Sequence, residues 1–183
     1  MAHNDSALSR QAAQMSCAVI RPEAASDADA VRSVTYEAFE SMPFAAGDEH
    51  LLIDALRSAH ALAVSLVAEV DGRIIGHIAI SPATPADDCA GWYALGPVSV
   101  LPACQRRGVG SDLVRRGLEE IAGLGAIGCI LTGDPAYYAR FGFEVAPALA
   151  PSEEPAEHFM VRLMGARNPR GPIRFHEAFH GGP

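Results

Sequence analysis

Residues 98–114, VSVLPACQRRGVGSDLV, join an apolar strand to an amphipathic helix through a loop rich in arginine and glycine. Apolar residues recur after this loop at helical spacing and form one stripe, at Leu113, Val114, Gly117, Leu118, Ile121 and Ala122. The first N–H groups of such a helix have no partner within the helix, and the helix dipole adds about half a positive charge at the same end. The stretch therefore predicts a strand, a turn and a helix whose N-terminus can receive a phosphate or pyrophosphate group.

The loop itself is open to two interpretations. Arg106 and Arg107 can add mobile positive charge, while Gly108 and Gly110 allow a ligand to approach the backbone closely. Alternatively, the glycines only make a tight turn and the arginines are solvated beside it. Two other phosphate-binding motifs fit poorly. The chain has no lysine for a nucleotide-hydrolase loop, and the segment GVGSDL lacks the third glycine of a dinucleotide-binding fingerprint.

Composition limits the classes of function. The 183 residues carry a formal net charge of −8, with 14 arginines, no lysine and 22 acidic residues. Such an acidic chain is a poor general nucleic-acid binder, so any anion site is expected to be local. No apolar run approaches the ~20 residues of a membrane span, no secretion signal is visible, and the four cysteines lack the spacing of a zinc site. We expect a cytoplasmic globular protein that binds neither nucleic acid nor membrane and holds no metal.

The pattern outward from the central stretch predicts one domain, residues 16–183, preceded by a polar extension, residues 1–15. Two helices should follow the first strand, the second over residues 49–58. The apolar face of that second helix is expected at Leu51, Leu52, Ala55 and Leu56. Two alternating segments around Asp71-Gly72 predict a β-hairpin. The order β-α-α-β-β-β-α-β-α-β-β predicts an α/β protein of the α+β type, with a central mixed sheet flanked by helices.

A second motif, GDPAYYARFGF at residues 133–143, follows the arginine-glycine loop. Together the two motifs resemble the signatures of the GCN5-related N-acetyltransferase (GNAT) superfamily. In that family a central strand leads into Gln/Arg-x-x-Gly-x-Gly/Ala and a helix, and a tyrosine on a short helix precedes Gly-Phe. Residues 105–110, QRRGVG, match the first pattern completely. The resemblance covers roughly residues 17–180, and the segments GHIAISP and RFHEAF are similar to a poorly characterised bacterial branch of predicted acetyltransferases.

The resemblance implies a GNAT-like fold with a mostly antiparallel sheet, and acetyl-CoA as the acetyl donor. In the family, the strand before the loop splays from its neighbour and the thioester lies in the gap. Backbone N–H donors in such a gap can stabilise a developing oxyanion by about 3 kcal/mol each. The residues expected to contact the cofactor, along the strand and at the helix start, are Val98, Val100, Gln105, Arg106, Arg107, Gly108, Val109, Gly110 and Ser111.

Tyr138 falls on the family's general-acid position, where a phenol can protonate the leaving thiolate. The adjacent Tyr137 points about 100° away on a helix and is expected to pack. The amine acceptor must lose a proton to attack, and Glu49 is the first candidate for the general base, with His77 the second. A water-relayed base is the alternative, because the strand LGPVSV carries no carboxylate. Asp134, ahead of Pro135, is expected to cap the short helix.

Two functions remain open from the sequence. The first is an acetyl-CoA-dependent N-acetyltransferase that moves the acetyl group directly to a primary amine in a ternary complex. The acidic net charge favours a cationic small-molecule or protein acceptor, such as a polyamine, an aminoglycoside-like amine or a protein N-terminus. The second is a non-catalytic acyl-CoA-binding sensor or regulatory module, which would need the loop but not Tyr138. The resemblance is also compatible with a homodimer.

Overall fold

The computed structural model describes residues 18–40, 42, 47–166 and 169–181, so the predicted extension over residues 1–15 lies outside the described residues. Seven strands form one mixed sheet, with the spatial order β1-β2-β3-β5-β6-β8-β7. Their bounds are β1 (Val19–Pro22), β2 (Val64–Val70), β3 (Arg73–Pro82), β5 (Trp92–Val100), β6 (Gly128–Thr132), β7 (Glu144–Val145) and β8 (Phe159–Leu163). The helices are α2 (Ala28–Phe39), α3 (Glu49–Ser58), α4 (Val109–Gly123) and α5 (Pro135–Tyr138). A separate two-stranded ladder pairs β4 (Thr84–Pro85) with β9 (Ile173–Arg174).

The strand pairing confirms the predicted mixed, mostly antiparallel sheet. Within the seven-stranded sheet only β5 and β6 run parallel, and every other neighbouring pair is antiparallel. The predicted hairpin joins β2 to β3 through Asp71 and Gly72, both of which have positive φ angles. A two-residue turn of this kind matches the twist of the strands that it connects. The hairpin prediction is therefore confirmed at the expected residues.

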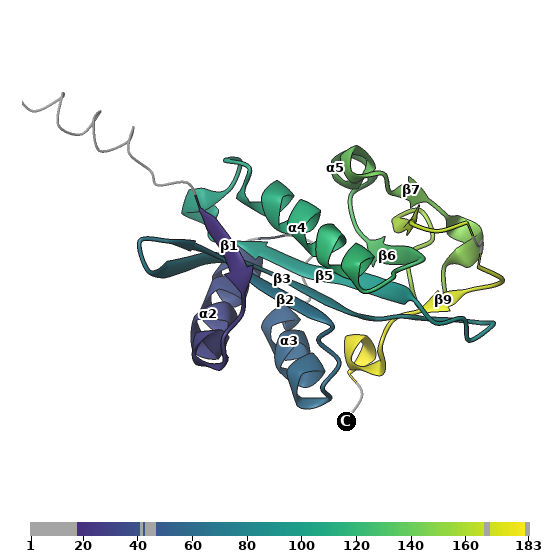
Figure 1. Cartoon of the computed structure of the whole chain (residues 1–183), viewed down its shortest axis with the longest axis horizontal. Coiled ribbons are helices and arrows are strands. Elements are labelled where there is room, and N and C mark those ends of the chain that lie inside the picture. The colour runs from purple at the N-terminus through teal and green to yellow at the C-terminus, as the bar shows by residue number, and fades with distance from the viewer. Residues whose placement is uncertain (1–17, 41, 43–46, 167–168, 182–183) are drawn as a thin grey trace, which may run out of the picture.

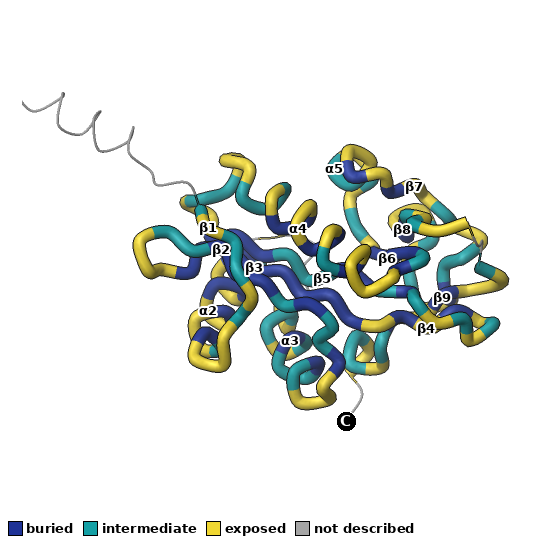
Figure 2. The backbone as a smooth tube through the Cα atoms, in the orientation of Figure 1, coloured by how far each residue is buried: buried dark blue, intermediate teal, exposed yellow. Residues whose placement is uncertain are grey.

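Helices cover both faces of the sheet. Helices α2 and α3 pack together on one face, and α4 lies on the other face with α5 beside it (Figure 1). The central strands between these layers are the most buried part of the backbone (Figure 2). The stripe expected on α4 is buried, except that Ala122 is exposed. At Gly117 an added Cβ would come within 2.9 Å of Ile80 Cδ1, so the helix lies close to the sheet at that position.

Helix α3 has its predicted bounds but a different buried face. The structure buries Ile53 and Leu56, while Leu51 is 48% exposed. Leu52 is half-buried and lines a cavity. The reason is that α3 packs against α2 rather than flat on the sheet. Its apolar residues are therefore divided between the core and the cavity described below.

Strand β5 positions the functional site, because it separates from β6 halfway along its length. The parallel pairing covers only Trp92–Ala94 with Gly128–Ile130, although both strands continue. On its other side β5 contains a bulge, since Val98 pairs with Ile78 while Leu95 pairs with Ile80. Gly96 and Pro97 therefore lie opposite one residue of β3, and bulges of this kind commonly bend a strand beside a functional site. The gap between β5 and β6 is the splay that the sequence resemblance led us to expect.

Candidate active site

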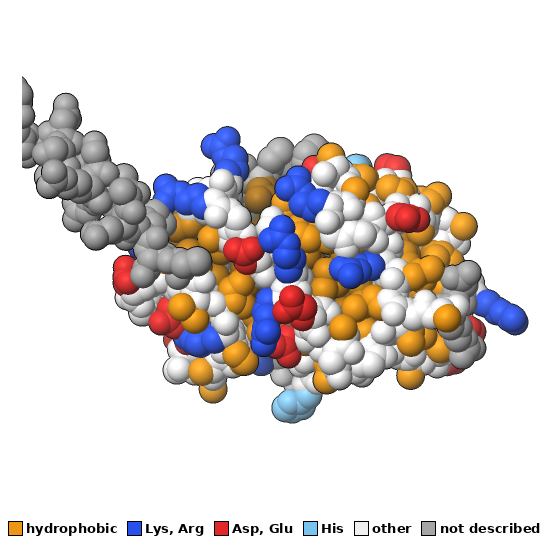
Figure 3. Space-filling view, turned by 45° about the horizontal axis from the view of Figure 1, so that its top comes forward, with side chains coloured by type: hydrophobic (Ala, Val, Ile, Leu, Met, Phe, Trp, Pro, Cys, Tyr) orange, Lys and Arg blue, Asp and Glu red, His pale blue; other side chains and the backbone are white. Residues whose placement is uncertain are grey.

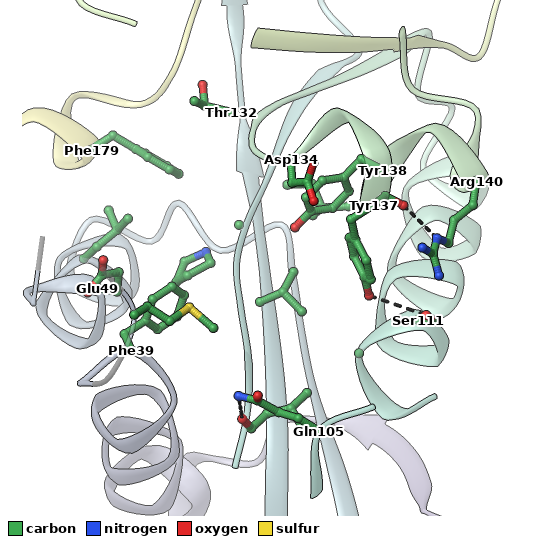
Figure 4. Close-up of a pocket in the computed structure, with 18 of the residues that line it drawn as sticks. Phe39, Glu49, Gln105, Ser111, Thr132, Asp134, Tyr137, Tyr138, Arg140 and Phe179 are labelled. Carbon is green, nitrogen blue, oxygen red and sulfur yellow. Dashed lines mark hydrogen bonds between the residues drawn. The ribbon is translucent and has the colours of Figure 1, made fainter. Parts of the chain in front are cut away.

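A cavity of about 950 Å³ occupies the region where β5 and β6 diverge (Figure 4). It is bounded by the N-terminus of α4 and by α5 on one side, and by α2, α3 and the C-terminal segment on the other. Of the residues predicted to contact a cofactor, those that line the cavity are Val98, Val100, Gln105, Arg106, Gly108, Gly110 and Ser111. Arg107 and Val109 belong to the same loop and helix start but are not part of the lining. Sequence-distant elements thus meet around one opening in the sheet.

The loop before α4 is shaped by its backbone. Gly108 is the residue before the helix and has φ of 92°, a left-handed conformation that favours glycine. Arg106 also has a positive φ, of 58°. The Gln105 side chain donates a hydrogen bond from Nε2 to the Val100 carbonyl, at 3.0 Å, and so ties the loop back to the end of β5. The result is a turn that places the N-terminus of α4 at the cavity, which Gly108, Gly110 and Ser111 line, and the first N–H groups of a helix have no partner within it.

Gly110 leaves the start of α4 open. A Cβ atom added there would lie 3.3 Å from the Tyr137 hydroxyl oxygen and 3.5 Å from Val100 Cγ2. Any longer side chain would have to extend into the cavity. Backbone N–H groups at a helix start bind anionic groups when nothing obstructs the approach. The geometry therefore fits a phosphate or pyrophosphate cradle better than a simple tight turn.

Positive charge lies beside this helix start in a chain that is acidic overall. The side chains of Arg106 and Arg140 line the cavity there. The guanidinium of Arg140 stacks on the Tyr137 ring at 4.8 Å and donates from Nε to the Tyr137 carbonyl at 2.9 Å. Arginine side chains gather on the α4 face of the molecule (Figure 3). Several of these belong to ion pairs on α4 itself, such as Arg115 with Asp112. Arg106 and Arg140 are the arginines among the described residues that line the cavity.

Tyr138 lies on α5 with its ring directed into the cavity (Figure 4). Its ring packs edge-on against Tyr137 and Phe143. Burial, with smaller contributions from Tyr137 and Asp134, raises the pKa of the Tyr138 phenol above its ordinary value. A phenol in this environment stays protonated and can donate a proton or hydrogen bond. Asp134 caps α5 by accepting a hydrogen bond from the Ala136 N–H at 2.9 Å, as predicted.

Tyr137 has a second role that sequence reasoning missed. Its ring packs on Phe141, as expected, but its hydroxyl reaches the start of α4 and lies 3.4 Å from Ser111 Oγ (Figure 4). The Tyr137 hydroxyl therefore forms one wall of the cradle. The expectation of packing alone was incomplete, because the direction of a side chain on a single helical turn also depends on how that turn docks.

Glu49, the first candidate for the general base, lines the cavity from α3. It lies across the opening from Tyr138 (Figure 4). One of its carboxylate oxygens accepts a hydrogen bond from the Gly47 N–H at 3.1 Å. The structure therefore brings Glu49 and Tyr138 to one cavity from opposite faces of the sheet.

His77, the second candidate for the base, is not brought to the cavity. Its side chain is fully buried in β3, and its Nε2 lies 2.8 Å from Ser65 Oγ, whose hydroxyl donates to Glu23. Arg57 of α3 donates to the same Glu23 carboxylate at 2.6 Å. Burial lowers the pKa of His77, so the ring is neutral and its Nε2–H can donate to the serine. His77 thus belongs to a network that ties α3 to the sheet, and its position gives no support to a role as base.

The cavity is also lined by residues that were not predicted as site residues, although two of them belong to the segment RFHEAF. Among them are Phe39, Thr132, Glu154, Phe175 and Phe179. These side chains come from α2, the end of β6, a loop and the C-terminal segment, so only the fold brings them together.

In the part of the chain that the structure describes, no three His, Cys, Asp or Glu side chains are grouped so as to hold a metal ion. Within the same described residues, no helix has the length and apolar character needed to cross a membrane.

Comparisons with known proteins give the same family throughout. A model of the acetyltransferase (GNAT) family matches residues 29–143. The chain is 33% identical over 129 residues to the uncharacterized N-acetyltransferase YhbS of Escherichia coli K12, covering 70% of this chain and 74% of that protein. A GNAT family acetyltransferase from Brucella melitensis, solved in complex with acetyl-CoA, is 44% identical with a TM-score of 0.79 and coverages of 88% and 97%. The structure of YhbS from E. coli in complex with CoA gives a TM-score of 0.82 at 30% identity, with coverages of 90% and 92%.

Proposed function

The chain belongs to the acetyltransferase (GNAT) family, and on that basis we propose that it transfers the acetyl group of acetyl-CoA directly to a primary amine in a ternary complex. It is an acetyl-CoA-dependent N-acetyltransferase, as its relatives are. Two of the similar structures are complexes with acetyl-CoA and with CoA. The observation that carries the proposal is one cavity that joins the open N-terminus of α4 to Tyr138 and continues through the sheet to α3. A donor and an acceptor can therefore meet there from opposite faces, and we assign the activity to a single domain over residues 16–183.

The cradle would hold the pyrophosphate of the cofactor. Residues 108–111 form the N-terminal turn of α4, whose first N–H groups have no partner within the helix, and Gly110 carries no side chain that would obstruct a ligand there. Arg106 and Arg140 add charge that neutralises phosphate, and the hydroxyls of Ser111 and Tyr137 can donate to its oxygens. Val98 and Val100 border the gap, where unpaired β5 backbone groups can bind the amides of the pantetheine arm. Arg107 and Val109 would contribute through their backbone.

Tyr138 is proposed as the general acid. Acetyl-CoA supplies an activated acyl group as a thioester, and its leaving group is a thiolate. A phenol is protonated at neutral pH, and burial raises the pKa of Tyr138 further, so the hydroxyl keeps its proton at alkaline pH as well. It can therefore donate that proton to the thiolate sulfur as the carbon–sulfur bond breaks. Backbone N–H groups of β5 in the same gap would stabilise charge on the carbonyl oxygen.

Glu49 is proposed as the base, acting directly or through a water molecule. An amine acceptor is mostly protonated at neutral pH and must lose a proton before it can attack. The Glu49 carboxylate faces the cavity from α3, on the side opposite the α4 cradle (Figure 4). Such a group can hold the ammonium form and then accept its proton. Glu154 and Asp134 also line the cavity, and each accepts a hydrogen bond, from Thr132 Oγ1 and from the Ala136 N–H respectively, as Glu49 does from the Gly47 N–H. Asp134 serves as the cap of α5, and Glu49 is the carboxylate that α3 contributes.

The alternative function is a sensor that binds acyl-CoA without turning it over. To test the proposal, the protein is incubated with acetyl-CoA and a pooled panel of primary amines, and both free thiol and acetylated amines are measured. Samples without protein and without amine are the controls. We expect thiol release that depends on amine and matches the acetylated product. Acetyl-CoA binding without any product from the pool would favour the sensor.

A further inference from the structure

The two ends of the cavity differ in chemistry. The end at α4 is polar, with Arg106, Arg140 and the open helix start. The end formed by α2, α3 and the C-terminal segment is lined by apolar side chains, among them Phe39, Leu52 and Phe179. The C-terminal 3₁₀ helix, Glu177–His180, packs beside α3 and so forms the outer wall of this end. A donor that occupies the polar end leaves the apolar end for the acceptor.

Phe175 and Phe179 form an aromatic wall at the apolar end of the cavity, and contacts with the core hold this wall in place. Phe175 is 8% exposed, and its ring contacts Phe159 edge-on at 6.1 Å. Phe179 packs on Phe175 with ring centroids 4.9 Å apart. The close-up shows Phe179 and Phe39 on the same side of the cavity as Glu49 (Figure 4). A wall that is already packed can bury apolar ligand surface without first being ordered.

Among the described residues, the charged side chains at the apolar end of the cavity are all acidic. The ionisable side chains that line it are Glu49 and Glu154, with Asp134 near Tyr138. The arginines that line the cavity, Arg106 and Arg140, both lie on the α4 and α5 side. An ammonium group would therefore be attracted to this end. A carboxylate or phosphate on the acceptor would find no cation among the described residues that line it.

We propose that the natural acceptor is a primary amine on an apolar body, an arylalkylamine or alkylamine, rather than a polyamine, an aminoglycoside or an amino acid. This inference rests on the proposed function. The ammonium would lie between Glu49 and Tyr138, and the apolar body would pack against Phe39, Leu52 and Phe179. An additional amine or hydroxyl on the part of the acceptor that packs against Phe39, Leu52 and Phe179 would be buried on apolar side chains without a hydrogen-bond partner there, which is unfavourable.

The inference is tested by equilibrium binding, which requires no turnover. Calorimetry with CoA-loaded protein would compare ethylamine, butylamine, hexylamine and 2-phenylethylamine. We expect affinity to rise roughly fourfold for each added methylene until the wall is covered. We also expect 2-phenylethylamine to bind at least about tenfold more tightly than spermidine or 3-phenylpropionate. Flat affinity across the alkylamines, or tighter binding of spermidine, would overturn the inference.

Substitutions of Phe179 test whether its ring contacts the bound amine. Phe179→Ala should weaken 2-phenylethylamine binding at least about fivefold and ethylamine binding hardly at all, because only the longer amine reaches the ring. Phe179→Leu should restore much of the affinity if apolar contact is the cause. Leu124→Ala, an exposed apolar residue at the end of α4, is the matched control. Equal loss for both amines in Phe179→Ala, with CoA affinity retained, would place the acceptor elsewhere.

The binding test and the activity test can fail separately. An apolar series that binds as expected but yields no acetylated product would support the acceptor class and contradict the proposed transfer reaction. Acetylation of spermidine with no binding of alkylamines would support the transfer reaction and overturn the acceptor class.

Discussion

Replacing Gly110 by tryptophan tests the cradle at its narrowest point. The first added atom would lie 3.3 Å from the Tyr137 hydroxyl and 3.5 Å from Val100 Cγ2, so the indole beyond it can only extend into the cavity. It would then cover the N–H groups of the first α4 turn. A hydrogen bond to a charged group contributes about 1.5–3 kcal/mol, so the loss of two such bonds should weaken CoA binding by about 100-fold or more.

The same change should not unfold the protein. Glycine inside a helix is less favourable than other residues by roughly 0.5–1 kcal/mol, so α4 loses nothing in intrinsic helix propensity. Gly123→Trp is the matched control, because it lies on the same helix and an added Cβ there meets nothing within 4 Å. The assay is calorimetric titration with CoA, with thermal unfolding measured in parallel. A folded Gly110→Trp variant that binds CoA within about threefold of the wild type would refute the assignment of the cradle.

Three further predictions concern charge and protons. Glu49→Gln should lower kcat/KM for an amine at least about tenfold at neutral pH. The loss should be smaller at alkaline pH, where the free amine is abundant. Glu37→Gln, on the exposed surface of α2, is the control and should leave kcat/KM unchanged. The value of kcat/KM should rise with pH as the amine loses its proton, and it should not fall again below about pH 9.5, because burial raises the pKa of Tyr138. A decrease of kcat/KM that begins below about pH 9 would contradict the role of Tyr138 as the acid. Burial alone would raise the pKa of Glu23, but the nearby His77 ring and hydrogen bonds from Ser65 and Arg57 outweigh it and lower the pKa from 4.5 to about 2. Ionised Glu23 therefore stabilises the fold at pH values above its unfolded pKa, and about 3 kcal/mol of the free energy of unfolding should be lost as pH falls from 4.5 toward 2. Denaturant unfolding of Glu23→Gln should not show this loss. The same pH dependence of stability in Glu23→Gln and the wild type would disprove the prediction.

Local patterns were sufficient to predict the elements around the α4 and α5 side of the cavity. The α4 stripe apart from Ala122, the hairpin at Asp71-Gly72 and the Asp134 cap each follow from residues close together in the chain, and the structure confirms them. The face of α3 was predicted only in part: Leu56 is buried as expected, but Ile53 is buried and Leu51 exposed, because the helix packs against α2, whose position no local pattern reveals. The divergence of β5 from β6 was expected only through the family resemblance.

Apart from Glu49, the side of the cavity formed by α2, α3 and the C-terminal segment could not be predicted, because its residues are far apart in the sequence. Phe39 and Phe179 meet only after the sheet has formed and the C-terminal segment has folded back over α3. His77 was predicted as a site residue, but the structure does not bring its side chain to the cavity. A histidine on a strand next to a predicted site was a reasonable base, but alternation along β3 turns it toward Ser65 and Glu23 instead of the cavity. Side-chain direction relative to distant elements is the information that the sequence did not carry.

A single-turnover measurement would test most directly whether Tyr138 acts on the thioester of a cofactor whose pyrophosphate is held at the α4 cradle. Wild-type protein and Tyr138→Phe, each loaded with acetyl-CoA, would be mixed with saturating amine, and the rate of thiol release would be followed. We predict that the rate constant falls at least about tenfold in Tyr138→Phe while the affinity for acetyl-CoA stays within a few-fold, because only the proton donor is lost. Equal rate constants in the two proteins would remove Tyr138 from the chemistry and contradict the proposed mechanism.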